Sequence, residues 1–219
     1  FNRLLGPVAA SDGHWPQNPA EVEAAARSSG FADPAAAAQR IAHWRGGSLR
    51  VLRSAAAREA LEDVLPQLMA AIGRASDPDR VLVHFDALIS RQSSTINLFR
   101  LFAARPQLLD ALVAVLSLAP ALATGLAARP ELIEGLIDAS VFANPASRVA
   151  LERRMGQGGA ADYERQLDHV RAVVGEHRFA LGVQLVEGAR DPLAVSRGYA
   201  DIADAAIEAT RVLNQAGVF

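Results

Sequence analysis

Apolar residues recur at helical spacing along most of the 219-residue chain. One set that shares a helix face is Leu108, Leu109, Leu112, Val115 and Leu116. A second set with the same spacing is Leu132, Ile133, Leu136 and Ile137. No five-residue run alternates between apolar and polar in the way that a half-buried strand requires. The pattern predicts an all-α fold, a bundle of about ten mostly short helices that ends in a long two-helix hairpin, with no significant sheet.

Proline residues divide this pattern into helices. Eight of the eleven open a stretch with helical spacing: Pro19, Pro34, Pro78, Pro106, Pro120, Pro130, Pro145 and Pro192. Proline suits the first helical position because its φ is already fixed and its missing N–H would be unpaired there. Four of these prolines follow a residue that can cap free backbone N–H groups, namely Asp33, Asp77, Asn144 and Asp191. Pro66 lies inside a continuous helical stretch, which we expect it to kink.

These signals predict the element boundaries and three regions. The expected helices are short ones within 19–52, then roughly 55–74, one from Pro78, and 94–104, 106–118, 120–128, 130–138, 160–189 and 192–216. Residues 6–18 form a linker by composition, and the Gly-rich GQGG at 156–159 breaks the pattern. The predicted regions are a linker with short helices (1–53), a central helical bundle (54–155) and the long hairpin (156–219).

One phrase of the sequence occurs twice. Residues 104–112 read ARPQLLDAL and residues 128–136 read ARPELIEGL. We interpret each Ala-Arg-Pro as the end of one helix and the start of the next. Residues 111–128 between them carry no charge, which raises the question of a membrane span. Pro120 and Gly125 interrupt this segment, and Ala, Gly, Ser and Thr dilute its apolar character. The sequence therefore favours stacked short helices over a membrane-spanning one.

The composition excludes several classes of protein. The net charge of −2 argues against non-specific attraction to nucleic acid or anionic lipid. Cysteine is absent, so disulfide frameworks and thiolate metal sites are excluded. No signal peptide is visible, and the sequence begins at Phe1 without a methionine. We therefore expect a cytoplasmic piece of a longer protein.

Histidines and carboxylates are the first candidates for chemistry. The five histidines are spread over the chain at His14, His43, His84, His169 and His177. The last two lie eight residues apart on one predicted helix, too far to share a metal directly. Asp201, Asp204 and Glu208 share a helix face and could hold a cation. Near a helix start they also suit the helix dipole, so we interpret them as a solvated acidic face.

Arginines are the remaining candidates. Six of them could bind an anion: Arg148, Arg153, Arg154, Arg165, Arg171 and Arg178. They alternate with the carboxylates Glu152, Asp162, Glu164, Asp168 and Glu176, which predicts i,i+4 pairing on a wet surface instead. GQGG lacks the Lys-Ser/Thr of a phosphate loop and follows no strand. We therefore predict no catalytic, cofactor-binding or metal-binding residue in this chain.

Apolar residues occupy more than one face of each helix in the predicted hairpin. They are Phe179, Leu181, Val183, Leu185 and Val186 in the first helix, and Tyr199, Ile202, Ile207, Val212 and Leu213 in the second. Two helices packed on each other bury one stripe of each, so the remaining apolar residues need another partner. We expect that partner to be a neighbouring domain or, in the isolated chain, a second copy.

Three segments, in this order, resemble the bifunctional glutamine synthetase adenylyltransferase/adenylyl-removing enzyme. They are SDPDRVLVHFDALISR (76–91), LFRLFAARPQLLDALVAVLSLAPALATGLAARPELIEGLID (98–138) and EHRFALGVQLVEGARDPLAVSRGYADIADAAIEA (176–209). The family pattern places a proline or Asp at the positions of Pro106, Pro120, Pro130 and Asp138. Many members carry Tyr at the position of Leu98 and Ser at that of Ala119. FNRLLG at 1–6 is similar to the end of the helix that closes the first catalytic half.

The resemblance covers most of residues 50–210 and implies a connecting role. It is to the helical region between the two nucleotidyltransferase domains, which hold ATP and Mg²⁺ through a Ser-Asp-x-Asp pattern. The only Asp-x-Asp here is Asp77-Pro78-Asp79, which its proline identifies as a helix cap. The resemblance thus implies a non-catalytic regulatory segment. Its partners would be the flanking domains, glutamine synthetase and the PII signalling protein. The alternative is a stand-alone helical adaptor with no enzymatic parent.

Overall fold

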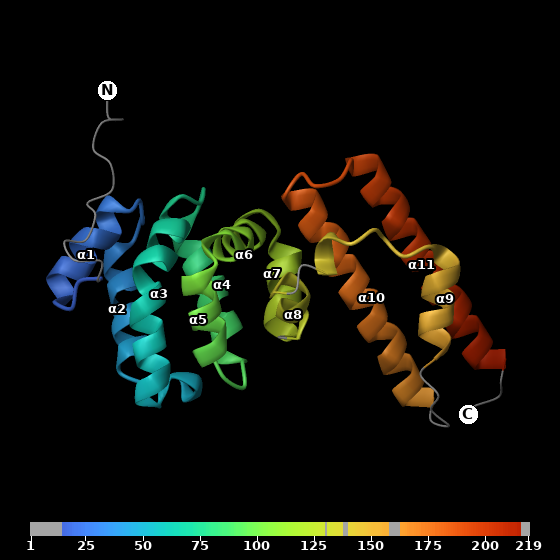
Figure 1. The fold of residues 1–219 in the computed structure, drawn as a ribbon, viewed down its shortest axis with the longest axis horizontal. Coiled ribbons are helices and arrows are strands. Elements are labelled where there is room, and N and C mark those ends of the chain that lie inside the picture. Colours follow the sequence, from blue (N-terminus) through green and yellow to red (C-terminus); the bar gives the residue numbers. More distant parts are fainter. Residues whose placement is uncertain (1–14, 130, 138–139, 158–162, 216–219) are drawn as a thin grey trace. The chain divides into compact units, whose positions relative to one another are not determined.

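The structure is a computed structural model that describes residues 15–129, 131–137, 140–157 and 163–215. These residues form α-helices and two short 3₁₀ helices and contain no strand (Figure 1), which confirms the predicted all-α class. The elements are α1 (Pro19–Ser28), α2 (Pro34–Arg45), η1 (Arg50–Leu52), α3 (Ala55–Gly73), α4 (Pro78–Ser90), α5 (Ile96–Ala104), α6 (Pro106–Leu118), α7 (Pro120–Ala128), α8 (Leu132–Ile137), η2 (Ser140–Phe142), α9 (Arg148–Gly156), α10 (Tyr163–Val186) and α11 (Pro192–Gln215).

Three of the four predicted caps are confirmed. Asp33 accepts a hydrogen bond from the Ala36 N–H at 3.0 Å. Asp77 accepts one from Arg80 N–H, and Asp191 accepts one from Ala194 N–H, each at 3.0 Å. Asn18 is a cap that the sequence analysis missed, and it accepts from the N–H of Ala20. Pro66 lies inside α3, and the helix continues through it.

The fourth predicted helix start is wrong. Pro145 opens no helix: α9 begins at Arg148, and Ser147 caps it by accepting from the N–H of Ala150. The side chain of Asn144 is instead engaged by a distant residue, because Nη2 of Arg190 donates to its Oδ1 at 3.0 Å. A cap position is a local signal, and a tertiary hydrogen bond has replaced it here. The start predicted at Pro130 lies outside the described residues.

The first Ala-Arg-Pro phrase forms a corner of one residue, Arg105, between α5 and α6, and the second ends α7 at Ala128. Arg105 has φ −133° and ψ 79°, and Arg129 has φ −133° and ψ 81°. Ala119, which precedes Pro120, has nearly the same angles, −129° and 78°. A residue before proline is pushed out of the helical region, so the chain turns at each of these positions. The turn from α5 to α6 is 110°.

Residues 1–130 form the first of two compact units, here called unit 1. Its centre is apolar, and its largest fully buried side chains include Trp44, Phe85, Phe99 and Phe102. In Figure 1, α3 stands beside α4 and α5 in this unit. The rings of Trp44 and Phe85 meet edge to face at 5.8 Å between centroids, a favourable aromatic geometry.

Helix α4 holds the ends of two other helices in unit 1. Nη2 of Arg80 donates to the carbonyl of Ser117, and Nδ1 of His84 donates to that of Leu116, both near the end of α6. Nη1 of Arg91, the residue directly after α4, donates to the carbonyl of Ala127 at the end of α7. The last carbonyls of a helix have no partner inside it, so these side chains satisfy groups that the proline corners leave free.

Residues 131–219 form the second compact unit, unit 2. This division differs from the predicted boundaries, which placed α9 with the central bundle. In the structure Leu151 and Met155 of α9 are buried in one cluster with residues of α10 and α11: Val170, Val173, Leu181, Val195, Ile202 and Ala205. Helical periodicity shows that α9 has an apolar side, but it does not show which helices cover that side.

Unit 2 itself covers part of the hairpin's second apolar face. Phe179, Leu181 and Val183 are all buried although they point to different sides of α10, because α8 and η2 pack on α10 in addition to α9 and α11. Leu185 remains 42% exposed and Ile207 67% exposed. The predicted self-association of this surface stays a prediction.

Among the described residues, no single helix is long and apolar enough to cross a membrane. One bent pair, α5 with α6, reaches the necessary length and composition when the two helices are taken together.

Two glycines in unit 1 provide a matched test of the packing. A Cβ at Gly73, the last residue of α3, would overlap the carbonyl oxygen of Ser29, whereas a Cβ at Gly125 in α7 would meet nothing within 4 Å. We expect Gly73→Ala to lower the free energy of unfolding by about 1–3 kcal/mol, because backbone must shift to admit the methyl group. Gly125→Ala should raise it by about 0.5–1 kcal/mol, because alanine loses less entropy in a helix. Urea unfolding of both variants measures these changes. A Gly73→Ala variant with an unchanged free energy of unfolding would contradict the close approach of Gly73 to Ser29.

Candidate functional site

The one Asp-x-Asp of the sequence serves two helix starts. Asp77 caps its own helix, α4. The carboxylate of Asp79 lies across from the α1–α2 turn and accepts from the N–H of Ala32 at 2.8 Å and from that of Asp33 at 3.1 Å. Both carboxylates are therefore engaged by backbone donors of separate segments. The prediction that this pair is a cap is confirmed for Asp77, and Asp79 fixes the α1–α2 turn against α4.

The histidines lie apart, and His84, His169 and His177 bond to backbone or to arginine. Nδ1 of His84 donates to a carbonyl of α6, as described above, and Nε2 of His169 donates to the carbonyl of Arg154 at 2.8 Å. His43 is exposed on α2, and His14 lies outside the described residues. Within residues 15–129, 131–137, 140–157 and 163–215, no three His, Asp or Glu side chains are grouped so that they could hold a metal ion.

The predicted acidic face of α11 is paired with arginine. Nη1 of Arg148 in α9 donates to Asp204 at 3.1 Å, and its Nε donates to Glu152 at 2.8 Å. Arg211 donates through two nitrogens to Glu208, which lowers the pKa of that carboxyl group. The carboxylates Asp204 and Glu208 thus take part in exposed ion pairs. Arg148 uses one of these pairs to attach the start of α9 to α11.

The predicted i,i+4 pairing is confirmed for Arg148 with Glu152, and Arg171 pairs with Asp168 at i,i+3. Arg154 departs from the prediction. Its Nη2 donates to Glu176 at 2.7 Å and its Nη1 to Nε2 of His177 at 3.2 Å, and both partners are on α10. Residue spacing cannot reveal such a pair, because the partners are more than twenty positions away. Asp162 lies outside the described residues.

The end of α9 is held by α10 through its backbone as well. Nε2 of the buried Gln166 donates to the carbonyl of Met155 at 2.6 Å, next to the bond from His169 to the carbonyl of Arg154. We call the set Arg154, Gln166, His169, Glu176 and His177 the α9 seat. These side chains bind the end of one helix to the middle of another, and they were not predicted as a group. The sequence contained one sign of this group, a histidine (His169) and an amide (Gln166) on successive turns of α10.

Two aromatic or imidazole groups of unit 2 have shifted pKa values. Burial, and then the charge of Arg154, lowers the pKa of His177 below its ordinary value, and Glu176 opposes this in part. Burial raises the pKa of Tyr199, whose hydroxyl donates to the carbonyl of Arg178 at 3.2 Å. His177 is therefore harder to protonate in the folded chain than an unburied histidine.

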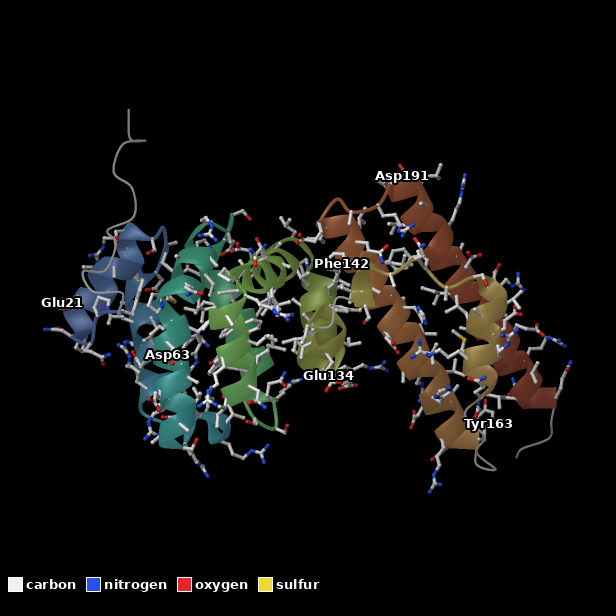
Figure 2. All side chains as sticks on the ribbon, viewed as in Figure 1. Glu21, Asp63, Glu134, Phe142, Tyr163 and Asp191 are labelled. Atoms are coloured by element: carbon white, nitrogen blue, oxygen red, sulfur yellow. The ribbon has the colours of Figure 1, made fainter. Side chains whose placement is uncertain are left out.

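A second polar cluster lies at the other end of the hairpin. Gln184 is 2% exposed, and its Nε2 donates to the carbonyls of Val141 and Ala143. Its Oε1 accepts from Nε of Arg190 at 2.6 Å, and Arg190 continues to Asn144. Figure 2 shows Asp191 at the start of α11, beside this cluster, and Tyr163 at the opposite end of the hairpin, where its hydroxyl donates to Asn214. Gln184 thus fixes η2 and the hairpin turn together.

Relatives of this chain have been identified across most of its length. A protein of Agrobacterium fabrum is 36% identical over 182 residues, and one of Mesorhizobium japonicum is 35% identical over 182 residues, each match covering 82% of this chain. A protein of Brucella melitensis is 34% identical over 166 residues, which is 75% of this chain. No family model matches the sequence.

The three relatives are much longer bacterial enzymes, and this helical chain is similar to one part of each of them. All three are described as bifunctional glutamine synthetase adenylyltransferase/adenylyl-removing enzymes. The chain is homologous to a segment of that enzyme, and the resemblance stated from the sequence is confirmed. The chain spans only 17–18% of the length of these relatives.

The cluster at Gln184 gives a test of unit 2. Gln184→Leu keeps the approximate volume but leaves two carbonyls and the Nε of Arg190 without their partner. We expect the free energy of unfolding to fall by about 2–4 kcal/mol. Gln39→Leu, at an exposed position within α2, is the control and should change it by less than about 0.5 kcal/mol. Equal effects of the two substitutions in thermal or urea unfolding would show that the Gln184 hydrogen bonds contribute nothing to stability.

Proposed function

We propose that this chain is a non-catalytic connecting segment of an enzyme that adenylylates glutamine synthetase and removes the adenylyl group. The proposal is supported by the homology, which covers most of this chain but less than a fifth of each relative. A segment of that size leaves ample length in the relatives for catalytic domains. The proposal places this chain between the two nucleotidyltransferase domains, as the resemblance of residues 50–210 implies.

The observation that supports a non-catalytic role is the hydrogen bonding of the one Asp-x-Asp, formed by Asp77 and Asp79. Nucleotidyl transfer requires two carboxylates that together hold Mg²⁺ and the phosphates of ATP. Asp77 and Asp79 instead accept hydrogen bonds from three backbone N–H groups of two segments. Their lone pairs are used to start α4 and to fix the α1–α2 turn. ATP and Mg²⁺ would therefore be held by other parts of the longer enzyme.

The two compact units suit a connecting role. Each unit has its own buried apolar centre, and their polar side chains join one helix to the next. Such a segment can hold flanking domains and pass a change at one of them to the other through helix–helix contacts. Glutamine synthetase and a PII-type signalling protein would be partners of the whole enzyme in the cytoplasm.

The first test uses the chain itself. Purified chain, glutamine synthetase, labelled ATP and Mg²⁺ are incubated together, and the label on the synthetase is measured. We expect none, because Asp77 and Asp79 are engaged by backbone N–H groups. The Agrobacterium fabrum enzyme serves as the positive control. Transfer by the chain that is lost in Asp77→Asn would show that the pair is catalytic and would overturn the proposal.

The second test distinguishes a connecting segment from a stand-alone adaptor. The matching segment of the Agrobacterium fabrum enzyme is deleted, or replaced by this chain. We expect deletion to abolish adenylylation of glutamine synthetase and replacement to restore a measurable part of it. The same replacement with the Mesorhizobium japonicum segment controls for tolerance to exchange. If that control is active while the chimera with this chain equals the deletion, the chain is not an equivalent connecting segment.

A further inference from the structure

Helix α9 is a short and weakly anchored helix of unit 2. It has nine residues, of which only Leu151 and Met155 are buried. A helix this short is not stable by itself in water, so its structure depends on packing against its neighbours. Its remaining attachments are polar: Arg148 to Asp204 at its start, and the α9 seat at its end. The Arg148–Asp204 and Arg154–Glu176 ion pairs are both exposed, so each contributes little by itself.

The bond between Arg154 and His177 requires one particular form of the imidazole. A guanidinium is always charged and only donates, so Nε2 of His177 must accept from Nη1 of Arg154. The ring is then neutral and carries its proton on Nδ1. Protonation of Nε2 would remove the acceptor and place two cations next to each other. His169 differs, because its Nε2 donates to a carbonyl and a protonated ring can still do so.

The other charges around His177 do not replace the lost bond. From α9 the group that faces it is Arg154, and from its own helix it is Glu176; no charged group of α8, η2 or α11 among the described residues acts on it. Glu176 already pairs with Nη2 of Arg154 at 2.7 Å. One carboxylate would then have to serve two cations, so charging His177 weakens the hold of Arg154 on α10.

We propose that α9 is a releasable clasp of unit 2, kept on α10 by the hydrogen bond from Arg154 to neutral His177 and loosened when His177 gains a proton. This goes beyond the proposed function and stands on the contacts of unit 2 alone. Release of α9 uncovers the apolar residues that Leu151 and Met155 cover on α10 and α11, among them Val173 and Ile202. The clasp thus links the charge of one side chain to exposure of an apolar surface.

The direction of the pH dependence follows from the position of His177. Burial and Arg154 lower its pKa in the folded state, so the proton binds better when α9 has left. The contribution of His177 to the attachment of α9 is therefore complete above the ordinary histidine pKa of about 6.5 and is lost as the pH falls through the lowered folded value.

Amide hydrogen exchange of α9 measures this release directly. Protection factors, corrected for the chemical exchange rate, are compared at pH 7.5 and pH 5.0 in the wild type and in His177→Gln. Glutamine can accept from Arg154 through its Oε1 but does not titrate. We expect the protection of residues 150–156 to fall by about threefold or more in the wild type on acidification and to be unchanged by pH in His177→Gln. Amides of α4 provide the internal reference.

His169→Gln is the matched control, because His169 is on the same helix and bonds to the same residue of α9. This variant should keep the pH dependence of the wild type. An equal fall in His177→Gln and the wild type, no fall in the wild type, or loss of the pH dependence in His169→Gln would each overturn the proposal. A second readout needs no variant of His177. The NMR titration of the His177 ring should share its midpoint with the shifts of the α9 amides, and separate midpoints would contradict the clasp.

Discussion

The carbonyl groups at the ends of short helices impose the main constraint on this chain. Each α-helix leaves its last carbonyls without an internal partner, and a chain of many short helices multiplies such groups. Some are satisfied locally, as at Arg105, whose N–H donates to the carbonyl of Leu101. Others are reached by side chains of a neighbouring helix. Arg80 and His84 of α4, and Arg91 directly after it, do this in unit 1. Gln166 and His169 of α10 do it in unit 2, where Gln184 does the same for η2.

The same constraint explains why polar side chains occur where a purely apolar core would be simpler. A buried carbonyl without a partner costs about 1–3 kcal/mol, so a donor from the next helix stabilises the contact and also fixes its register. Gln184 illustrates this, since one amide joins η2, the end of α10 and Arg190. α4 and α10 therefore act as the central helices of their units. Polar groups used in this way hold the helices together, as the proposed connecting role requires.

These hydrogen bonds between helices also determine where the structure of unit 2 can change. Most of these hydrogen bonds use an amide or a guanidinium, whose hydrogen-bonding capacity does not vary with pH between 5 and 8. The Arg154–His177 contact is different, because its acceptor is lost on protonation. It lies at the end of α9, which has two buried apolar side chains, Leu151 and Met155. A small change in charge therefore acts on a short helix with few apolar anchors.

Part of this structure could be predicted from the sequence, because it depends on interactions between residues close together in the chain. Fixed φ angles at Pro106 and Pro120 and the cap at Asp77 act within a few residues, so the helices and corners were predicted close to their observed bounds. Partners distant in sequence were not predictable, because periodicity marks a buried face without naming what covers it. The tertiary structure alone assigned α9 to the hairpin, gave Asn144 to Arg190 and joined Arg154 to His177. Those outcomes depend on which helices meet in space, and a local pattern of residues does not contain that information.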